Sequence, residues 1–174
     1  AGNGDHRRAG RTGGDAVIPY VDIAEMYYTA CKFSDCADFC MRELEEKETF
    51  QYLYDDPAIV NAAFSCEVFL KLLLHLEQID CKKSHKLKQL FELLPPEMME
   101  IVKYQTTQKC GYWKDVWDQE ILSQVSDAFE KWRYFYEIDR AKSGSIHFDI
   151  GFLLAFRDAL RAVCEKKLGV KEVL

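Results

Sequence analysis

The feature that most constrains the fold is an apolar stretch of helical pattern between residues 56 and 78. Asp56 is a suitable N-cap and Pro57 a suitable first helical residue. Nearly all later positions are Ala, Val, Ile, Leu, Phe or Cys, and the polar ones fall on one side of a helical wheel: Asn61, Ser65, Glu67, Lys71, His75 and Gln78. A helix with so wide an apolar face needs neighbours on several sides, which predicts a central helix.

A short second helix is predicted after residues 79–83, which break the apolar pattern. Ser84 is its expected cap, and Pro95-Pro96 ends it. Its apolar residues have helical spacing: Leu87, Leu90, Phe91 and Leu94. The stretch from 56 to 94 therefore predicts a helix–turn–helix pair at the centre of the fold.

Helical spacing also predicts a helix over residues 20–47, with room for a kink at 33–35. Its expected apolar face is Ala24, Tyr27, Tyr28, Cys31, Cys36, Phe39 and Cys40. Another helix is expected from Pro96, before a polar loop at 106–114. Its expected buried residues are Met98, Met99, Ile101, Val102 and Tyr104.

Two further helices are predicted over residues 115–138 and 148–168, with a turn at 142–145 and Gly169 at the final C-terminus. The first has an apolar stripe of Trp117, Ile121, Val125, Ala128, Trp132 and Phe135. The second has a stripe of Phe148, Phe152, Phe156, Leu160 and Val163. No segment shows strand alternation. The fold class is therefore all-α, an up-and-down bundle of four to six helices spanning 19–174, preceded by a flexible tail at 1–18.

Net charge and cysteine content bear on which kinds of ligand and metal this protein could bind. The net charge of −6 argues against a strongly basic surface for nucleic acid, although it leaves room for a local basic site. The seven cysteines are odd in number and lie mostly within helical patterns, as in a reduced, cytoplasmic protein. Cys36 and Cys40 could form half a metal site, but no second pair completes it, so we expect no metal and no cofactor. No apolar run reaches the ~18 residues of a membrane span, and the N-terminus lacks a signal-peptide pattern.

Three segments, in this order, resemble the HEPN family (higher eukaryotes and prokaryotes nucleotide-binding): SCEVFLKLLL at 65–74, SHKLKQLFELLP at 84–95 and DAFEKWRYFYE at 127–137. The resemblance covers roughly residues 20–168. It implies a HEPN-like bundle, a homodimer, and a role in binding RNA, a nucleotide or a protein partner such as a nucleotidyltransferase. Toxin–antitoxin or phage-defence systems are the implied setting, with no membrane partner.

Arg140 and His147 form the one candidate catalytic motif. HEPN ribonucleases carry an Arg, four to six residues and a His at the start of the last helix, and two chains pair to complete the site. A histidine can shuttle protons near pH 7, and an arginine can neutralise charge on phosphate oxygens, so metal-independent RNA cleavage is chemically reasonable. Two departures from the family favour a non-catalytic module: Ala141 stands where the family has a polar residue, and Gly144 interrupts the gap.

Charged residues at the edge of the predicted core form a second candidate site. Glu67, Lys71 and His75 occupy successive turns of one helix, and Arg133 and Glu137 are one turn apart on another. They suit either a structural network that pairs charges at the core edge or a binding site.

His85 has two interpretations as well. It could contact a phosphate or base within a cluster of Lys82, Lys83, Lys86 and Lys88, or it could pack at a helix start. The sequence therefore favours a HEPN-like, non-catalytic binding module, with the endoribonuclease as the alternative.

Overall fold

The computed structural model describes residues 22–46, 55–81, 83–110, 117, 121–134 and 149–170. Within these ranges every regular element is a helix: α1 (Ile23–Glu46), α2 (Asp55–Leu76), α3 (Leu87–Phe91), α4 (Pro96–Cys110), α5 (Ile121–Val125), α6 (Ala128–Arg133) and α8 (Ile150–Leu168). Four of these helices are long, and the others are single-turn or two-turn elements. The predicted all-α bundle is confirmed. The tail at 1–18 lies outside the described residues.

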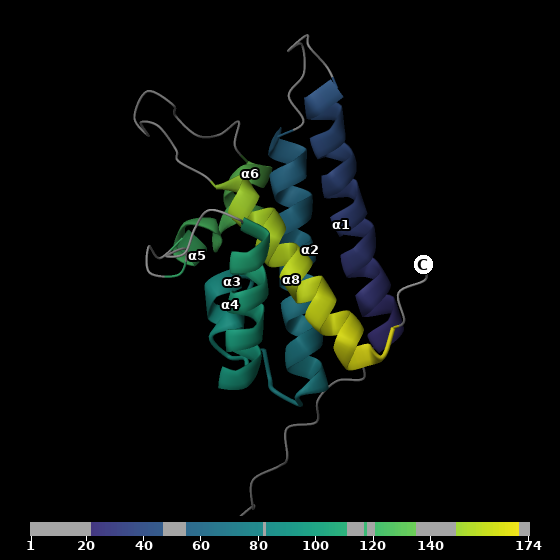
Figure 1. Ribbon diagram of the computed structural model, residues 1–174, viewed down its shortest axis with the longest axis vertical. Coiled ribbons are helices and arrows are strands. Elements are labelled where there is room, and N and C mark those ends of the chain that lie inside the picture. The colour runs from purple at the N-terminus through teal and green to yellow at the C-terminus, as the bar shows by residue number, and fades with distance from the viewer. Residues whose placement is uncertain are drawn as a thin grey trace, which may run out of the picture.

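Helix α2 is the centre of the bundle, as its apolar pattern predicts. It begins at Asp55, one residue before the predicted cap, and packs against α1, α3, α6 and α8 (Figure 1). Its largest fully buried side chains include Phe69, Leu70, Leu72, Leu73 and Leu74. Two polar positions, Ser65 and Glu67, are also buried because α2 is covered on more than its apolar face.

Among the described helices, α2 alone has the length and the apolar composition of a helix that could cross a membrane. Of its most apolar 18-residue window, 67% is buried inside the bundle. The core helix of a folded domain passes the same test, so this finding is weak evidence for a membrane span.

The last helix follows its prediction closely. The Oδ1 atom of Asp149 accepts a hydrogen bond from the Phe152 backbone N–H at 2.8 Å, which caps the start of α8. Gly169 ends the helix with φ of 67°, a left-handed conformation that glycine adopts without a steric penalty. Phe152 and Phe156 stack in the core, and Phe156 meets Phe91 of α3 edge-on. Local caps and an apolar stripe are therefore sufficient to specify α8.

Helix α1 spans 23–46 without interruption, so the suggested kink is absent, and its buried face differs from the predicted one. Tyr27, Cys31 and Cys40 are buried as expected. Four residues predicted to be buried are exposed: Ala24, Tyr28, Cys36 and Phe39. The side of α1 that faces the core carries small residues instead, namely Ala30, Ser34 and Ala37. Small side chains let α1 approach α2 closely enough for Ser65 Oγ to donate to the Ala30 carbonyl at 2.9 Å.

Helix α4 begins at Pro96 as predicted but continues to Cys110, so residues 106–110 are helical rather than a loop. Thr106 is buried because its hydroxyl donates to the Val102 carbonyl one turn earlier, at 2.8 Å. The prediction that Ile101 and Tyr104 are buried is wrong, since these side chains are 45% and 67% exposed. No element among the described residues covers that side of α4.

The long helix predicted over 115–138 is replaced, where described, by α5 and α6. The break falls at Ser126, whose carbonyl accepts from the Leu87 backbone N–H at 3.2 Å and whose hydroxyl accepts from the Lys88 N–H at 3.0 Å. These bonds satisfy the first N–H groups of α3, a role predicted for Ser84. Ser84 Oγ instead accepts from the Lys86 N–H at 3.2 Å, just before α3 begins. Buried Ile121, Val125 and Ala128 nevertheless keep the predicted stripe.

Candidate functional site

Glu67 is the centre of a polar cluster at the edge of the core. Its residue is 2% exposed, and its Oε1 atom lies 2.7 Å from Lys71 Nζ and 2.9 Å from His85 Nδ1. The second oxygen, Oε2, is buried and has no hydrogen-bond donor among the described residues. We refer to Glu67, Lys71 and His85 as the Glu67 cluster. A buried carboxylate depends on such partners, because an unpaired buried charge is costly.

The cluster joins α2 to the segment before α3. Lys71 lies one helical turn after Glu67, whereas His85 comes from the connection that leads into α3. That connection is held on its other side by the bonds from Leu87 and Lys88 to Ser126. His85 is therefore fixed from two directions, although its side chain is 54% exposed.

The bond to Glu67 sets the orientation of the His85 imidazole. The bond to Glu67 occupies Nδ1, so Nε2 is the ring nitrogen through which His85 can act. A carboxylate that fixes one nitrogen of a histidine sets the ring's orientation and so directs the other nitrogen. With the ring half exposed, this arrangement can hydrogen-bond a phosphate oxygen or exchange a proton.

Exposed lysines flank His85 in the sequence. Lys83 and Lys86 are exposed, and Lys86 Nζ lies 3.5 Å from Asp127 Oδ1, a surface pair with a 50% exposed lysine side chain. Lys88 donates to Ser123 Oγ at 2.9 Å and so is directed toward α5. Lys82 lies outside the described residues. We call Lys71, Lys83, His85 and Lys86 the cationic rim.

The other predicted network residues are placed apart from the Glu67 cluster. Arg133 is exposed and stacks over the rings of Phe129 and Tyr134, at 4.9 and 4.7 Å from their centroids, rather than pairing with Glu67. His75 is half-buried on α2, two turns beyond Glu67. Glu137 lies outside the described residues. Of the predicted polar residues, the structure thus brings together Glu67, Lys71 and His85.

The candidate catalytic pair, Arg140 and His147, lies outside the described residues. Helix α8 starts after this pair, at Ile150. On α8, Gly151 is exposed, whereas Leu154 packs partly against the core and Asp158 pairs with Arg157.

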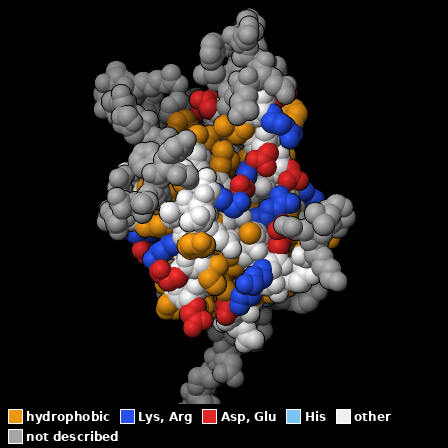
Figure 2. Space-filling view, in the orientation of Figure 1, with side chains coloured by type: hydrophobic (Ala, Val, Ile, Leu, Met, Phe, Trp, Pro, Cys, Tyr) orange, Lys and Arg blue, Asp and Glu red, His pale blue; other side chains and the backbone are white. Residues whose placement is uncertain are grey.

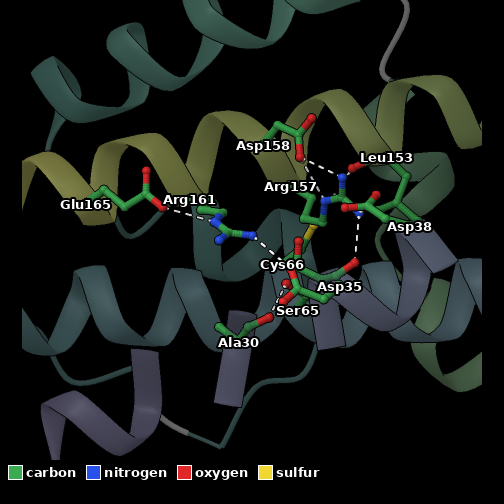
Figure 3. Close-up of polar contacts among 11 residues, drawn as sticks. Ala30, Asp35, Asp38, Ser65, Cys66, Leu153, Arg157, Asp158, Arg161 and Glu165 are labelled. Carbon is green, nitrogen blue, oxygen red and sulfur yellow. Dashed lines mark hydrogen bonds and ion pairs between the residues drawn. The ribbon is translucent and has the colours of Figure 1, made fainter. Parts of the chain in front are cut away.

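A buried arginine on α8 was missed by the sequence analysis. Arg157 is 4% exposed; its Nη1 lies 2.7 Å from Asp38 Oδ1, and its Nη2 lies 2.6 Å from Asp158 Oδ1 (Figure 3). Burial alone would lower the pKa of Arg157, but the two carboxylates outweigh it and hold that pKa above its ordinary value. Nη1 also donates to the Ser34 carbonyl at 3.3 Å, so Arg157 ties α8 to α1.

One turn later, Arg161 makes a second link between the same helices. Its Nε lies 3.0 Å from Glu165 Oε1, and its Nη1 lies 3.2 Å from Asp35 Oδ1 (Figure 3). Figure 2 shows acidic and basic side chains next to one another on this face rather than a uniformly basic surface. The repeat of Arg157 and Arg161 on α8, opposite Asp35 and Asp38 on α1, is a signal that sequence reasoning could have used.

The cysteines are unpaired. Cys66 and Cys164 are fully buried, and burial raises the pKa of both thiols well above the ordinary value. Cys36 is exposed and Cys40 is buried, so the two do not present their sulfurs to one surface. In the described part of the chain, no group of three or more His, Cys, Asp or Glu side chains could hold a metal ion.

A groove of about 410 Å³ lies between the ends of α2, α4 and α8. Met98, Ile101 and Val163 supply its apolar side, and the ion pair of Glu77 with Lys167 lies at its edge. It contains none of the candidate residues predicted from the sequence.

Comparisons with known proteins found no matching family model, no matching curated protein and no matching solved structure. The resemblance to the HEPN family therefore stays a prediction based on the three sequence segments.

Proposed function

We propose that this chain is a HEPN-like, non-catalytic module that binds the phosphates of RNA or of a nucleotide at the cationic rim. The observation that carries the proposal is the bond between buried Glu67 and half-exposed His85, at 2.9 Å. It holds a histidine at the surface in one orientation, with lysines on either side. A purely structural carboxylate needs its charge neutralised, and Lys71 already does this at 2.7 Å.

Phosphate suits this site for chemical reasons. A histidine N–H and lysine ammonium groups are hydrogen-bond donors that phosphate oxygens accept, and such charge-assisted bonds are stronger than neutral ones. The rim is a local feature of a chain with net charge −6, which favours a small number of phosphate contacts over extended electrostatic binding. Single-stranded RNA or a nucleotide fits such a short site better than a long duplex.

Fluorescence anisotropy with a labelled single-stranded RNA, in EDTA, tests the proposal, with a nucleoside triphosphate as competitor. We expect Lys83→Ala and His85→Ala each to weaken binding by about 10- to 150-fold, since a charge-assisted hydrogen bond contributes roughly 1.5–3 kcal/mol. Log affinity should fall with log salt with a slope of about −2, as for three phosphate contacts on a single strand.

Lys103→Ala is the matched control, because Lys103 is a surface lysine of α4 paired with Glu100 and lies outside the rim. It should leave binding unchanged. Equal losses for Lys83→Ala and Lys103→Ala would mean that the protein attracts RNA by general charge alone. No binding at low salt would refute the proposal.

A further inference from the structure

The outward side of α1 carries six exposed residues at alternating spacings of three and four: Glu25, Tyr28, Lys32, Asp35, Phe39 and Arg42. This spacing places all six on one stripe of a helix, as in the seam of a coiled coil. The opposite side of α1 packs on α2. We call these six residues the α1 stripe. Apart from Asp35, which pairs with Arg161 of α8, no residue of the stripe has a role in the fold or in phosphate binding described above.

Two aromatic side chains of the α1 stripe are exposed on the same side of the helix. Tyr28 is 57% exposed and Phe39 is 53% exposed, three helical turns apart. Their burial against an apolar surface would be favourable, because each carries a large hydrophobic area. The exposed pair points to a surface that is covered by another molecule.

The order of side chains in the α1 stripe is complementary to itself when reversed. If two copies of α1 pair antiparallel about a two-fold axis at residues 33–34, each charge meets its opposite and each aromatic meets an aromatic. Glu25 faces the second copy's Arg42, Tyr28 faces its Phe39, and Lys32 faces its Asp35. In a parallel pair, by contrast, every charged residue would face the same residue of the second copy, and like charges would repel.

We propose that the α1 stripe is an antiparallel homodimer interface, occupied by a second copy of this chain. This inference is independent of phosphate binding. The stripe runs from residue 25 to residue 42, about 26 Å along the helix at 1.5 Å per residue. An interface of two such helices is smaller than a standard stable interface, so the dimer should depend on protein concentration and on salt.

Ion pairs within one chain do not prevent this pairing. Lys32 Nζ lies 3.3 Å from Glu25 Oε1, and Asp35 pairs with Arg161 at 3.2 Å. The side chains of Lys32, Glu25 and Asp35 are all more than 60% exposed. Exposed pairs of this kind contribute little, so these side chains can turn to the second copy or share partners with it.

Charge reversal tests the interface by sedimentation equilibrium. Glu25→Arg puts like charges into both end layers of the dimer, and so does Arg42→Glu. Each should weaken the dimer by about tenfold, since two layers change from attraction to repulsion. The double variant Glu25→Arg/Arg42→Glu should dimerise like the wild type, because it restores opposite charges in both end layers. In a parallel pair the two single variants would not weaken the dimer, since like charges face each other in every variant. The two single variants, when mixed, should associate with each other more tightly than either does with itself.

Phe39→Ala should weaken the dimer by at least tenfold, because it removes one of the two rings in both aromatic layers. Glu100→Arg, an exposed charge reversal on α4, is the control and should not change the dimer constant. Thermal melts should show that every variant folds. A wild type that stays monomeric at its highest soluble concentration would overturn the proposal, and so would a double variant that dimerises no better than the single ones.

Discussion

The links between Arg157 and two carboxylates allow a quantitative prediction for stability. Arg157 is 4% exposed, whereas the side chains of Asp38 and Asp158 are 44% and 39% exposed. The guanidinium is thus the buried member of the group, and its pKa lies above its ordinary value, so it cannot escape by losing its proton. The stability of the folded protein therefore depends on Arg157 keeping at least one carboxylate partner.

The two carboxylates should therefore behave as partial substitutes for each other. Asp38→Ala or Asp158→Ala leaves Arg157 one charged partner, and each should cost about 1–2 kcal/mol, as for a charged hydrogen bond at a partly exposed site. The double variant leaves a buried charge unpaired and should cost about 3–5 kcal/mol or more, beyond the sum of the single losses. Arg157→Met should cost less than the double variant, because it removes the buried charge and leaves two hydrated carboxylates.

Urea denaturation of the four variants measures these free energies of unfolding, with Glu130→Ala, at an exposed position of α6, as the control for loss of an acidic side chain. The expected order of losses is the double variant, then Arg157→Met, then either single variant. If the two single losses add to the double loss within about 0.5 kcal/mol, the carboxylates act independently and the reasoning is refuted.

Three other predictions concern the core, the thiols and the candidate catalytic motif. Leu73→Ala should lower the free energy of unfolding by about 2–5 kcal/mol in urea denaturation, since Leu73 is fully buried in α2. Ile101→Ala, at an exposed position, should lower it by less than about 1 kcal/mol, and equal losses would mean that α2 is not the core helix. The free energy of unfolding should fall as pH rises past the ordinary thiol pKa of about 9, because burial raises the pKa of Cys66 and Cys164 and only the unfolded thiols ionise there. A Cys66→Ala/Cys164→Ala variant should lose less stability over the same pH range, and a variant with the same pH dependence as the wild type would contradict this prediction. If the endoribonuclease alternative holds, the protein should cut single-stranded RNA in EDTA to 2′,3′-cyclic phosphate ends, and His147→Ala should slow cleavage by about 10²–10⁴-fold; intact RNA at high enzyme concentration would exclude that activity.

Sequence patterns predicted the helices whose signals are local. Helices α2 and α8 combine a wide apolar pattern with a suitable start, and both form within a residue or two of the predicted ends. The predicted helix at 115–138 failed because its break at Ser126 serves the first N–H groups of α3, a partner about 38 residues away in sequence. Hydrogen bonds between segments that are distant in sequence produce no periodic pattern of residues in either segment, so the sequence alone does not predict them.

The candidate site was predicted only in part, for a similar reason. Glu67 and Lys71 are one turn apart, so their pairing follows from helix geometry. The bond from His85 to Glu67 joins a loop to a helix, and its formation depends on how the segment before α3 returns across α2. Arg157 was overlooked because it directly follows core residue Phe156 in an apolar helix. A single charged residue there signals a buried ion pair when complementary acids face it from another helix.

Histidine NMR during an RNA titration tests the central claim, phosphate binding at the cationic rim, most directly. The chain has four histidines, so their side-chain resonances can be assigned by substituting each in turn. Adding single-stranded RNA should shift the His85 resonances through Nε2, while His75, half-buried on the same helix as Glu67, should stay unchanged. Glu67→Gln should reduce the His85 shift, because the ring loses the carboxylate that orients it. RNA that binds and shifts His147 while His85 stays unchanged would contradict the account and place the ligand at the Arg140–His147 motif.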